Sequence, residues 1–340
     1  MIIAWLTMIA PITALLGWLL EQPVAAWLAA SLLLAPLAVI GLWRTVQSPN
    51  LLIRWPVMQY FGWGAVLLPL TVIGAIATLW LPTPTVGLAV LGAWLVLGAA
   101  GVVAATRISE RRLSFDHARL DRPYKLIQLS DLHVGSRSAA FLRRAVEQAL
   151  RHEPDAVLIT GDLIDASAVK EEDLSALADI SCPVYVSLGN HERYIDVDAA
   201  AAMIEAQGVG LLRSRAVIQG SLQVIGIDDA DDPAHVARSL PEIALSDDHY
   251  RILLYHRPDG WAEARQAGIN LMLAGHTHAG QIWPFNYLVK RQFRHLVGLF
   301  SQDGHYLYVS PGTGCWGPIM RLGTRAEMTV IDLRPVGGDD

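Results

Sequence analysis

The first 106 residues form a nearly continuous apolar segment that contains only three charged side chains. Four apolar runs follow one another in this segment, approximately Ile2–Leu20, Val24–Trp43, Val57–Trp80 and Val86–Thr106. Each run has the roughly 20 residues that a helix needs to cross a hydrocarbon core about 30 Å thick. The pattern therefore predicts a transmembrane domain of four helices over residues 1–106.

Tryptophan and proline positions favour the membrane interpretation. Eight of the eleven tryptophans lie in residues 1–106, several of them at run ends, where an interfacial aromatic belt would place them. Pro11, Pro36 and Pro69 lie inside runs, which a membrane bundle tolerates because neighbouring helices satisfy the freed backbone groups. A cleaved signal peptide would explain only the first run, which lacks a basic start. A buried soluble core does not explain four successive runs almost without charge.

Arginines between and after the runs predict the orientation. Arg44 and Arg54 lie between the second and third runs, and Arg107, Arg111 and Arg112 follow the fourth, whereas the other two connections contain no Arg or Lys. Basic segments stay on the cytoplasmic side of a membrane. We therefore expect a multi-pass protein of the cell (inner) membrane, with both termini and the polar remainder of the chain in the cytoplasm.

From residue 124 onward, short apolar segments alternate with amphipathic ones, which is typical of a layered α/β fold. We therefore expect a linker over residues 107–123 and an α/β domain over residues 124–335. The expected strands are Tyr124–Leu129, Ala156–Ile159, Val184–Leu188, Leu222–Ile227, Ile252–Tyr255, Leu271–Leu273, Tyr306–Ser310 and Met328–Leu333, and the expected helices are Ala139–Arg151, Glu171–Ala178 and Val197–Gln207.

Charge and cysteine content exclude two other classes of protein. The formal net charge is −6 at pH 7, whereas a nucleic-acid-binding domain needs a basic surface, so we expect no nucleic-acid partner. Cys182 and Cys315 are the only cysteines and lie far apart. The sequence therefore predicts neither a disulfide framework nor a thiolate-bound metal.

Residues that bind metals follow five of the predicted strands. Because α/β folds place their sites at the carboxyl ends of strands, these side chains are candidates for one common site. Side chains two apart in an extended segment point to the same side and adjacent ones to opposite sides, so Asn190 and His191 should serve different purposes. The candidates in chain order are Asp131, His133, Asp162, Asn190, His191, His256, His276 and His278.

The chemistry of these candidates indicates two divalent metal ions. Imidazole, carboxylate and amide ligands suit Mn, Fe or Zn better than Ca or a thiolate-bound metal. Without His191, the other seven candidates are too many ligands for one tetrahedral ion, and a carboxylate can bridge two cations at the ~3.5–4 Å separation used in phosphoryl chemistry. Asp162 lies in the middle of the series and is the best bridging candidate.

The series Asp131-x-His133, Gly161-Asp162, Gly189-Asn190-His191-Glu192, His256 and Gly275-His276-x-His278 resembles the calcineurin-like metallophosphoesterase family. The resemblance implies a four-layer α/β/β/α sandwich with a dinuclear metal centre. It departs from the family at Glu192, where many members have Asp. By matching the family's motifs, the resemblance implies that one ion is bound by Asp131, His133 and His278. It implies that the other ion is bound by Asn190, His256 and His276, and that Asp162 bridges the two. It also implies that His191 is the catalytic histidine.

Further motifs resemble the membrane-associated phosphodiesterase branch of this family. These are Gly275–Gln281 and Val309–Gly314, followed by Arg321 and Glu327. Some relatives in that branch are UDP-2,3-diacylglucosamine pyrophosphatases. The resemblance implies hydrolysis of a phosphodiester or pyrophosphate bond in an amphiphilic, lipid-linked substrate, with Mn as the first choice of metal.

Two alternatives stay open: a phosphatase or nucleotidase that acts on a soluble substrate, and a non-enzymatic metal-binding scaffold. Retention of every ligand and of His191 argues against the scaffold, since binding alone needs none of them. The segment Trp283–His295 interleaves aromatic and basic side chains. It is either a solvated loop with partly buried rings or a cap that contacts membrane lipid headgroups or a nucleotide diphosphate.

Overall fold

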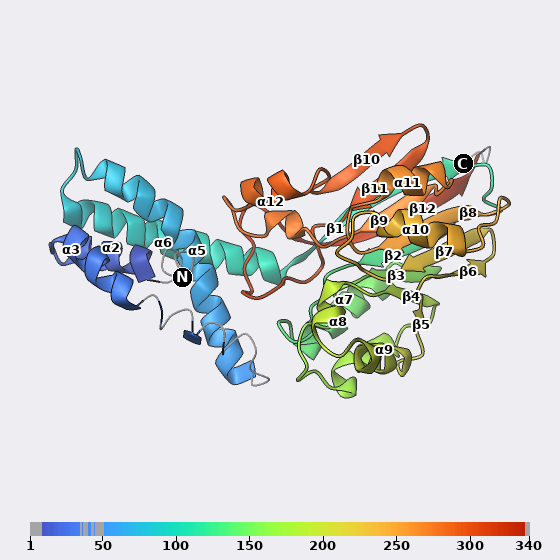
Figure 1. The fold of residues 1–340 in the computed structure, drawn as a ribbon, viewed down its shortest axis with the longest axis horizontal. Coiled ribbons are helices and arrows are strands. Elements are labelled where there is room, and N and C mark those ends of the chain that lie inside the picture. The colour runs from blue at the N-terminus through green and yellow to red at the C-terminus, as the bar shows by residue number, and fades with distance from the viewer. Residues whose placement is uncertain (1–8, 35, 37–39, 42–43, 45–50, 337–340) are drawn as a thin grey trace. The chain divides into compact units, whose positions relative to one another are not determined.

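The computed structural model describes residues 9–336 except 35, 37–39, 42–43 and 45–50 (Figure 1). The chain divides into two compact units. The first comprises residues up to Thr106 together with Ile282–Phe285 and Gly317–Gly323, and the second comprises the rest of the chain.

Two helices of the first unit are long and apolar enough to cross a membrane. They are α5 (Leu51–Ala77), whose candidate span is Trp55–Ala77, and α6 (Thr83–Thr106). Glycine allows the pair to pack closely, because a Cβ at Gly98 would lie only 2.1 Å from the ring of Trp63. The indole Nε1 of Trp94 also donates a hydrogen bond to the carbonyl oxygen of Trp63 at 2.8 Å.

The prediction of four spanning helices is wrong for the part of the chain that the structure describes. The first run contributes α2 (Ala10–Leu19), and the second contributes α3 (Val24–Ser31) and the 3₁₀ turn η2 (Leu32–Leu34). Both α-helices are too short to cross the membrane. Apolar composition alone does not ensure a continuous α-helix, since tighter 3₁₀ hydrogen bonding replaces it at Leu32. Most of the remainder of these two runs falls on residues outside the described part.

The prediction of a linker over residues 107–123 is also wrong for most of that segment. Ile108–His117 forms strand β1, which pairs in parallel with β12 (Ala326–Pro335). Leu113 and Phe115 of β1 are buried in the core of the second unit. Only Arg107 therefore separates the end of α6 from the first strand of the α/β domain.

The second unit contains two mixed six-stranded sheets. The strand order of the first is β1-β12-β2-β3-β4-β5, and that of the second is β10-β11-β9-β8-β7-β6. The remaining strands of the first sheet are β2 (Tyr124–Leu129), β3 (Ala156–Thr160), β4 (Val184–Ser187) and β5 (Gly210–Leu211). The second sheet consists of β6 (Arg215–Gln219), β7 (Leu222–Ile227), β8 (Tyr250–Tyr255), β9 (Leu271–Ala274), β10 (Gly298–Gln302) and β11 (His305–Val309).

Helices cover the outer faces of both sheets, as Figure 1 shows for the second unit. Neighbouring residues of β2 point to different layers: Leu126 lies in the core between the sheets, and Ile127 packs under α7 (Ala139–Leu150). Because central strands are buried on both faces, they appear in the sequence as continuous apolar runs. The helices near the first sheet are η3 (Glu171–Leu177), α8 (Asn190–Tyr194) and α9 (Val197–Glu205), and those near the second are α10 (His235–Ser239), η4 (Leu240–Glu242) and α11 (Trp261–Gln266). The order helix, sheet, sheet, helix agrees with the expected α/β fold.

Candidate metal centre

The predicted ligands all follow the carboxyl ends of strands, where the chain turns sharply. β2 leads to Asp131 and His133, β3 to Asp162, and β9 to His276 and His278. These five residues have φ values between 49° and 71°, in the left-handed region. Such backbone conformations cost free energy and are typically retained where the surroundings position a functional side chain.

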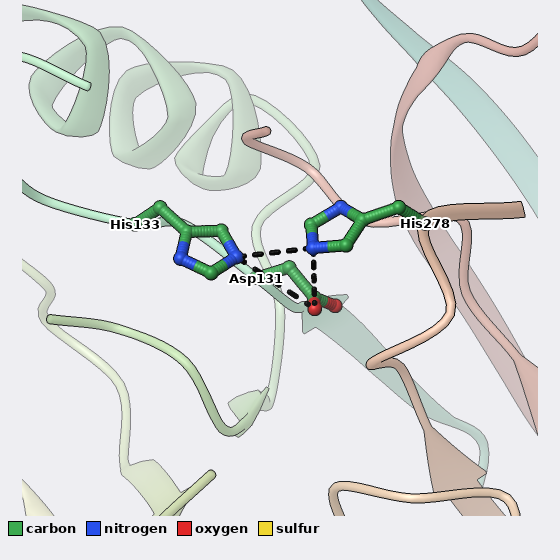
Figure 2. A group of neighbouring side chains, drawn as sticks. All are labelled: Asp131, His133 and His278. Carbon is green, nitrogen blue, oxygen red and sulfur yellow. Dashed lines mark hydrogen bonds and ion pairs between the residues drawn. The ribbon is translucent and has the colours of Figure 1, made fainter. Parts of the chain in front are cut away.

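The first group of side chains consists of Asp131, His133 and His278 (Figure 2). The Nε2 atoms of the two imidazoles lie 3.1 Å apart. The Oδ1 atom of Asp131 lies 3.4 Å from Nε2 of His278 and 4.0 Å from Nε2 of His133. Two imidazole nitrogens and one carboxylate oxygen thus converge on a common point.

The second group consists of Asp162, His256 and His276, with Asn190 beside them. The Nε2 atom of His256 lies 3.1 Å from Oδ2 of Asp162, 3.1 Å from Oδ1 of Asn190 and 3.2 Å from Nδ1 of His276. The Nδ1 atom of His256 lies 2.8 Å from the carbonyl oxygen of Thr160, a hydrogen bond that orients the ring.

Asp162 lies between the two groups. Its Oδ2 atom is 3.7 Å from Nε2 of His133 and 3.1 Å from Nε2 of His256. Its Oδ1 atom accepts a hydrogen bond from the backbone N–H of His191 at 2.9 Å, and Nε2 of His191 lies 3.9 Å from its Oδ2. The carboxylate is therefore placed where a bridging ligand would have to be.

Buried charges in the centre shift the pKa values of its members. Burial acts to raise the pKa of Asp162, but the charge of His256 and its hydrogen bond hold that pKa well below the usual range. Burial likewise acts to lower the pKa of His256, and Asp162 raises it to about 10. Burial, with the charge of His256 adding to it, lowers the pKa of His276 to about 3. A metal ion bound by the His256 imidazole would have to displace its proton, because a histidine binds metal in its neutral form.

The donor set fits divalent metal ions. Asp131, Asp162 and His256 are almost fully buried, and burying ionised groups is costly unless they are paired or bind a metal. Imidazole, carboxylate and amide donors suit Mn, Fe or Zn. The structure brings together every residue that the sequence predicts as a ligand, and their roles as ligands stay a prediction.

The sequence predicts an extended backbone at Asn190 and His191, and this prediction is wrong. The extended segment ends at Gly189, and Asn190 begins helix α8. The two side chains still diverge, because Asn190 contacts His256 whereas the imidazole of His191 faces Asp162. Their separate environments thus come from a helix start and not from strand alternation.

Sequence reasoning missed the support that Glu192 gives to two motif blocks. Its buried carboxylate accepts hydrogen bonds from the backbone N–H groups of Gly189 at 2.7 Å, Ile164 at 2.8 Å and Asp162 at 3.2 Å. Burial and the charge of Asp162 raise its pKa to about 7. Glu192 therefore holds the turns that carry Asp162 and Asn190, and the longer side chain at this position is used in full.

Asp165 was also missed, although it follows Asp162 by three residues in the same block. Its Oδ2 atom lies 3.5 Å from Nδ1 of His133 and 2.5 Å from Oγ of Ser136, and its Oδ1 atom accepts from the N–H of Ser136 at 2.8 Å. A carboxylate behind a candidate metal-binding imidazole fixes the tautomer and the direction of the ring.

An arginine–aspartate network connects two ligand blocks that lie far apart in the sequence. Arg193 of α8 and Arg257, next to His256, both bind the buried carboxylate of Asp229, each with a contact of 2.7 Å. Both guanidinium groups also contact Asp231. The network therefore braces the segments that carry Asn190, His191 and His256.

Comparison with known proteins identifies the family of this fold and site. Residues 124–280 match the model of the calcineurin-like phosphoesterases. Over 234 residues, the chain is 30% identical to a metallophosphoesterase of Aquifex aeolicus, covering 63% of this chain and 86% of that one. The chain belongs to the calcineurin-like metallophosphoesterases. Its α/β domain is thus of the class of metal-dependent phosphoester hydrolases.

Further relatives of this metallophosphoesterase have names that differ in what they state about function and location. It is 35% identical to the Bos taurus "transmembrane protein with metallophosphoesterase domain", covering 62% of this chain and 53% of that one. It is 27% identical to the phosphodiesterase YaeI of Escherichia coli, covering 62% of this chain and 82% of that one. It is 33% identical to a Helicobacter pylori metallophosphoesterase, of whose length it spans 65%.

Proposed function

We propose that this metallophosphoesterase is anchored in the cell membrane and hydrolyses a phosphodiester or pyrophosphate bond in an amphiphilic substrate, such as UDP-2,3-diacylglucosamine. The observation that carries the proposal is the pair of donor groups that share Asp162. Relatives named as a phosphodiesterase and as a transmembrane protein support the reaction class and the membrane location.

The two donor groups would hold two divalent cations, with Mn as the first choice. When bound, such cations make hydroxide available near neutral pH and neutralise the oxygens of a phosphate. Asp131, His133 and His278 would hold one ion, and Asn190, His256 and His276 the other. Asp162 would serve both.

His191 is proposed to act on the departing oxygen. Hydrolysis forms a bond between a water oxygen and phosphorus and breaks the bond to the leaving group, which then needs a proton or a hydrogen bond. Burial lowers the pKa of His191 to about 4, although the charge of Asp162 opposes this. The imidazole is therefore neutral near pH 7, which favours donation of a hydrogen bond to the developing negative charge over transfer of a proton from imidazolium.

Membrane anchoring is supported by α5 and α6, which are long and apolar enough to span. Their short connection, Thr78–Pro82, contains no Arg or Lys, whereas Arg54 precedes the span of α5 and Arg107 follows α6. We propose that both basic ends, and with them the α/β domain, face the cytoplasm.

This orientation predicts the behaviour of reporter fusions. A reporter that is active only outside the cytoplasm should be silent when fused after Asp340 and active when fused after Pro82, between the two helices. Enzymatic activity of the reporter in intact cells measures both. Activity after Asp340 together with silence after Pro82 would reverse the proposed orientation.

Helix α12 (Asn286–Gln292) supports an amphiphilic substrate. None of its residues is buried, and Tyr287 and Leu288 are each 61% exposed. Lys290, Arg291 and Arg294 lie in or next to the same helix. Each basic residue near anionic lipid contributes about 1 kcal/mol to membrane attraction. We propose that this segment guides a lipid-bearing substrate toward the centre.

Replacing Lys290, Arg291 and Arg294 with Gln should lower the turnover of a lipid-linked diphosphate in anionic vesicles by about tenfold or more. Turnover of a small chromogenic diester should not change. The matched control replaces three exposed arginines in or next to helix α7, Arg143, Arg144 and Arg151, with Gln and should leave both activities intact. Hydrolysis of both substrates by Mn²⁺-loaded protein is the measurement. Equal losses on both substrates would mean that the segment supports the centre itself.

The same assay separates the alternatives. A phosphatase or nucleotidase that acts on a soluble substrate would hydrolyse a monoester faster than either diester and would show no dependence on vesicles. A binding scaffold would hydrolyse none of these substrates with Mn²⁺ bound.

A further inference from the structure

Two exposed aromatic rings flank the imidazole of His191. The ring centroid of Tyr194 lies 5.4 Å from that of His191, and the centroid of Trp316 lies 6.0 Å from it. Tyr194 is 66% exposed and Trp316 is 43% exposed. The two residues are 122 positions apart in the sequence and are brought together by the fold.

The backbone beneath each ring is held firmly. Tyr194 ends helix α8, and its neighbour Arg193 binds Asp229 at 2.7 Å and Asp231 at 2.9 Å. The backbone of Trp316 is bound on both sides by one side chain: Nε2 of Gln281 donates to its carbonyl oxygen at 2.9 Å, and its N–H donates to Oε1 of Gln281 at 3.2 Å.

The polar metal centre gives no reason for two exposed aromatic side chains beside it. The centre consists of carboxylates and imidazoles, and large aromatic side chains beside it leave apolar surface in water. Aromatic side chains bury a large apolar area on binding, and two aromatic rings in an offset-stacked or edge-to-face arrangement are stabilised beyond that burial. Rings that are held at their backbone and exposed to solvent are thus suited to bind a flat group.

We propose that Tyr194 and Trp316 form a binding subsite for an aromatic ring on the leaving group, such as a nucleobase. The proposal rests on the proposed function, in which His191 acts on the departing oxygen. Whatever is attached to that oxygen must pass beside His191, and therefore beside the two rings. The leaving group would then be the nucleotide side of an amphiphilic diphosphate.

Two phosphonates of nearly equal size test the subsite. Phenylphosphonate carries a flat aromatic ring, and cyclohexylphosphonate carries a puckered saturated one. With full-length, Mn²⁺-loaded protein, we expect phenylphosphonate to inhibit hydrolysis of bis(p-nitrophenyl) phosphate about tenfold more strongly than cyclohexylphosphonate. In the Trp316→Leu and Tyr194→Leu variants this preference should fall by roughly threefold to tenfold. Inhibition of both variants by inorganic phosphate should be as strong as inhibition of the wild type. The Trp316→Phe variant, which keeps an aromatic ring, should retain most of the preference for phenylphosphonate.

Two outcomes would overturn the subsite: no preference for the phenyl compound in the wild type, or equal weakening of both phosphonates and inorganic phosphate in the variants. The second outcome would assign a structural role to the two rings. If the wild type hydrolyses no diester at all, the proposed function fails. Equilibrium binding of the two phosphonates to the Mn²⁺-loaded protein would then test the subsite separately.

Discussion

The Asp162→Asn variant should lose hydrolysis altogether and bind fewer than two metal ions per chain. In the native protein, Oδ2 of Asp162 lies 3.1 Å from Nε2 of His256 and 3.7 Å from Nε2 of His133, so this carboxylate contacts both donor groups. Replacing it with an amide removes the negative charge that would bridge two cations, while the shape of the side chain stays the same. Metal content by mass spectrometry and hydrolysis of a diester measure the two effects.

Asp179→Asn is the matched control for this variant. Asp179 pairs with Arg143 at the surface, where an ion pair is worth little, so the same chemical change should leave metal content and rate unchanged. Two bound ions and full activity in Asp162→Asn would refute the bridging role.

The His191→Ala variant should keep its metal and lose its rate. His191 is not a member of either donor group proposed to bind metal, and its Nε2 atom lies 3.9 Å from the shared carboxylate. Groups that transfer protons or stabilise charge in this way typically contribute ~10²–10⁴-fold to the rate. We therefore expect a fall of that size in kcat for diester hydrolysis with two ions still bound.

His256→Ala provides the contrast, because it removes a proposed ligand and should lower metal content. If His191→Ala were also empty of metal, His191 would have to be reassigned as a ligand. If it kept both its metal and its rate, the departing oxygen would have to be stabilised by another group.

The second unit was largely predictable from the sequence, because its central strands are apolar on both faces. Tyr124–Leu129 and Leu222–Ile227 have the predicted bounds. Strand β1 was missed because it lies at the edge of a sheet and carries charged residues such as Arg111 and Arg112, as edge strands commonly do. Its pairing with β12 depends on residues more than 200 positions away, which local patterns do not contain.

The candidate ligands were predictable for a different reason. Metal-binding side chains after several strands have few alternative explanations, and the carboxyl ends of neighbouring strands meet in space. The residues that hold them were not predictable. Asp229 is an ordinary acidic residue in the sequence, and only the fold places it between Arg193 and Arg257. For the residues that the structure describes, apolar composition likewise overestimated the number of spanning helices, since it contains no information on where helical hydrogen bonding stops.

The single residue between α6 and β1 has a kinetic consequence. If α6 crosses the membrane as proposed, Arg107 gives the α/β domain no flexible tether with which to search the surrounding solution. Encounter with substrate is then a two-dimensional process, and the concentration that sets the rate is the mole fraction of substrate in the bilayer. Adding inert lipid would slow turnover by surface dilution even though the amounts of enzyme and substrate in the vessel stay the same.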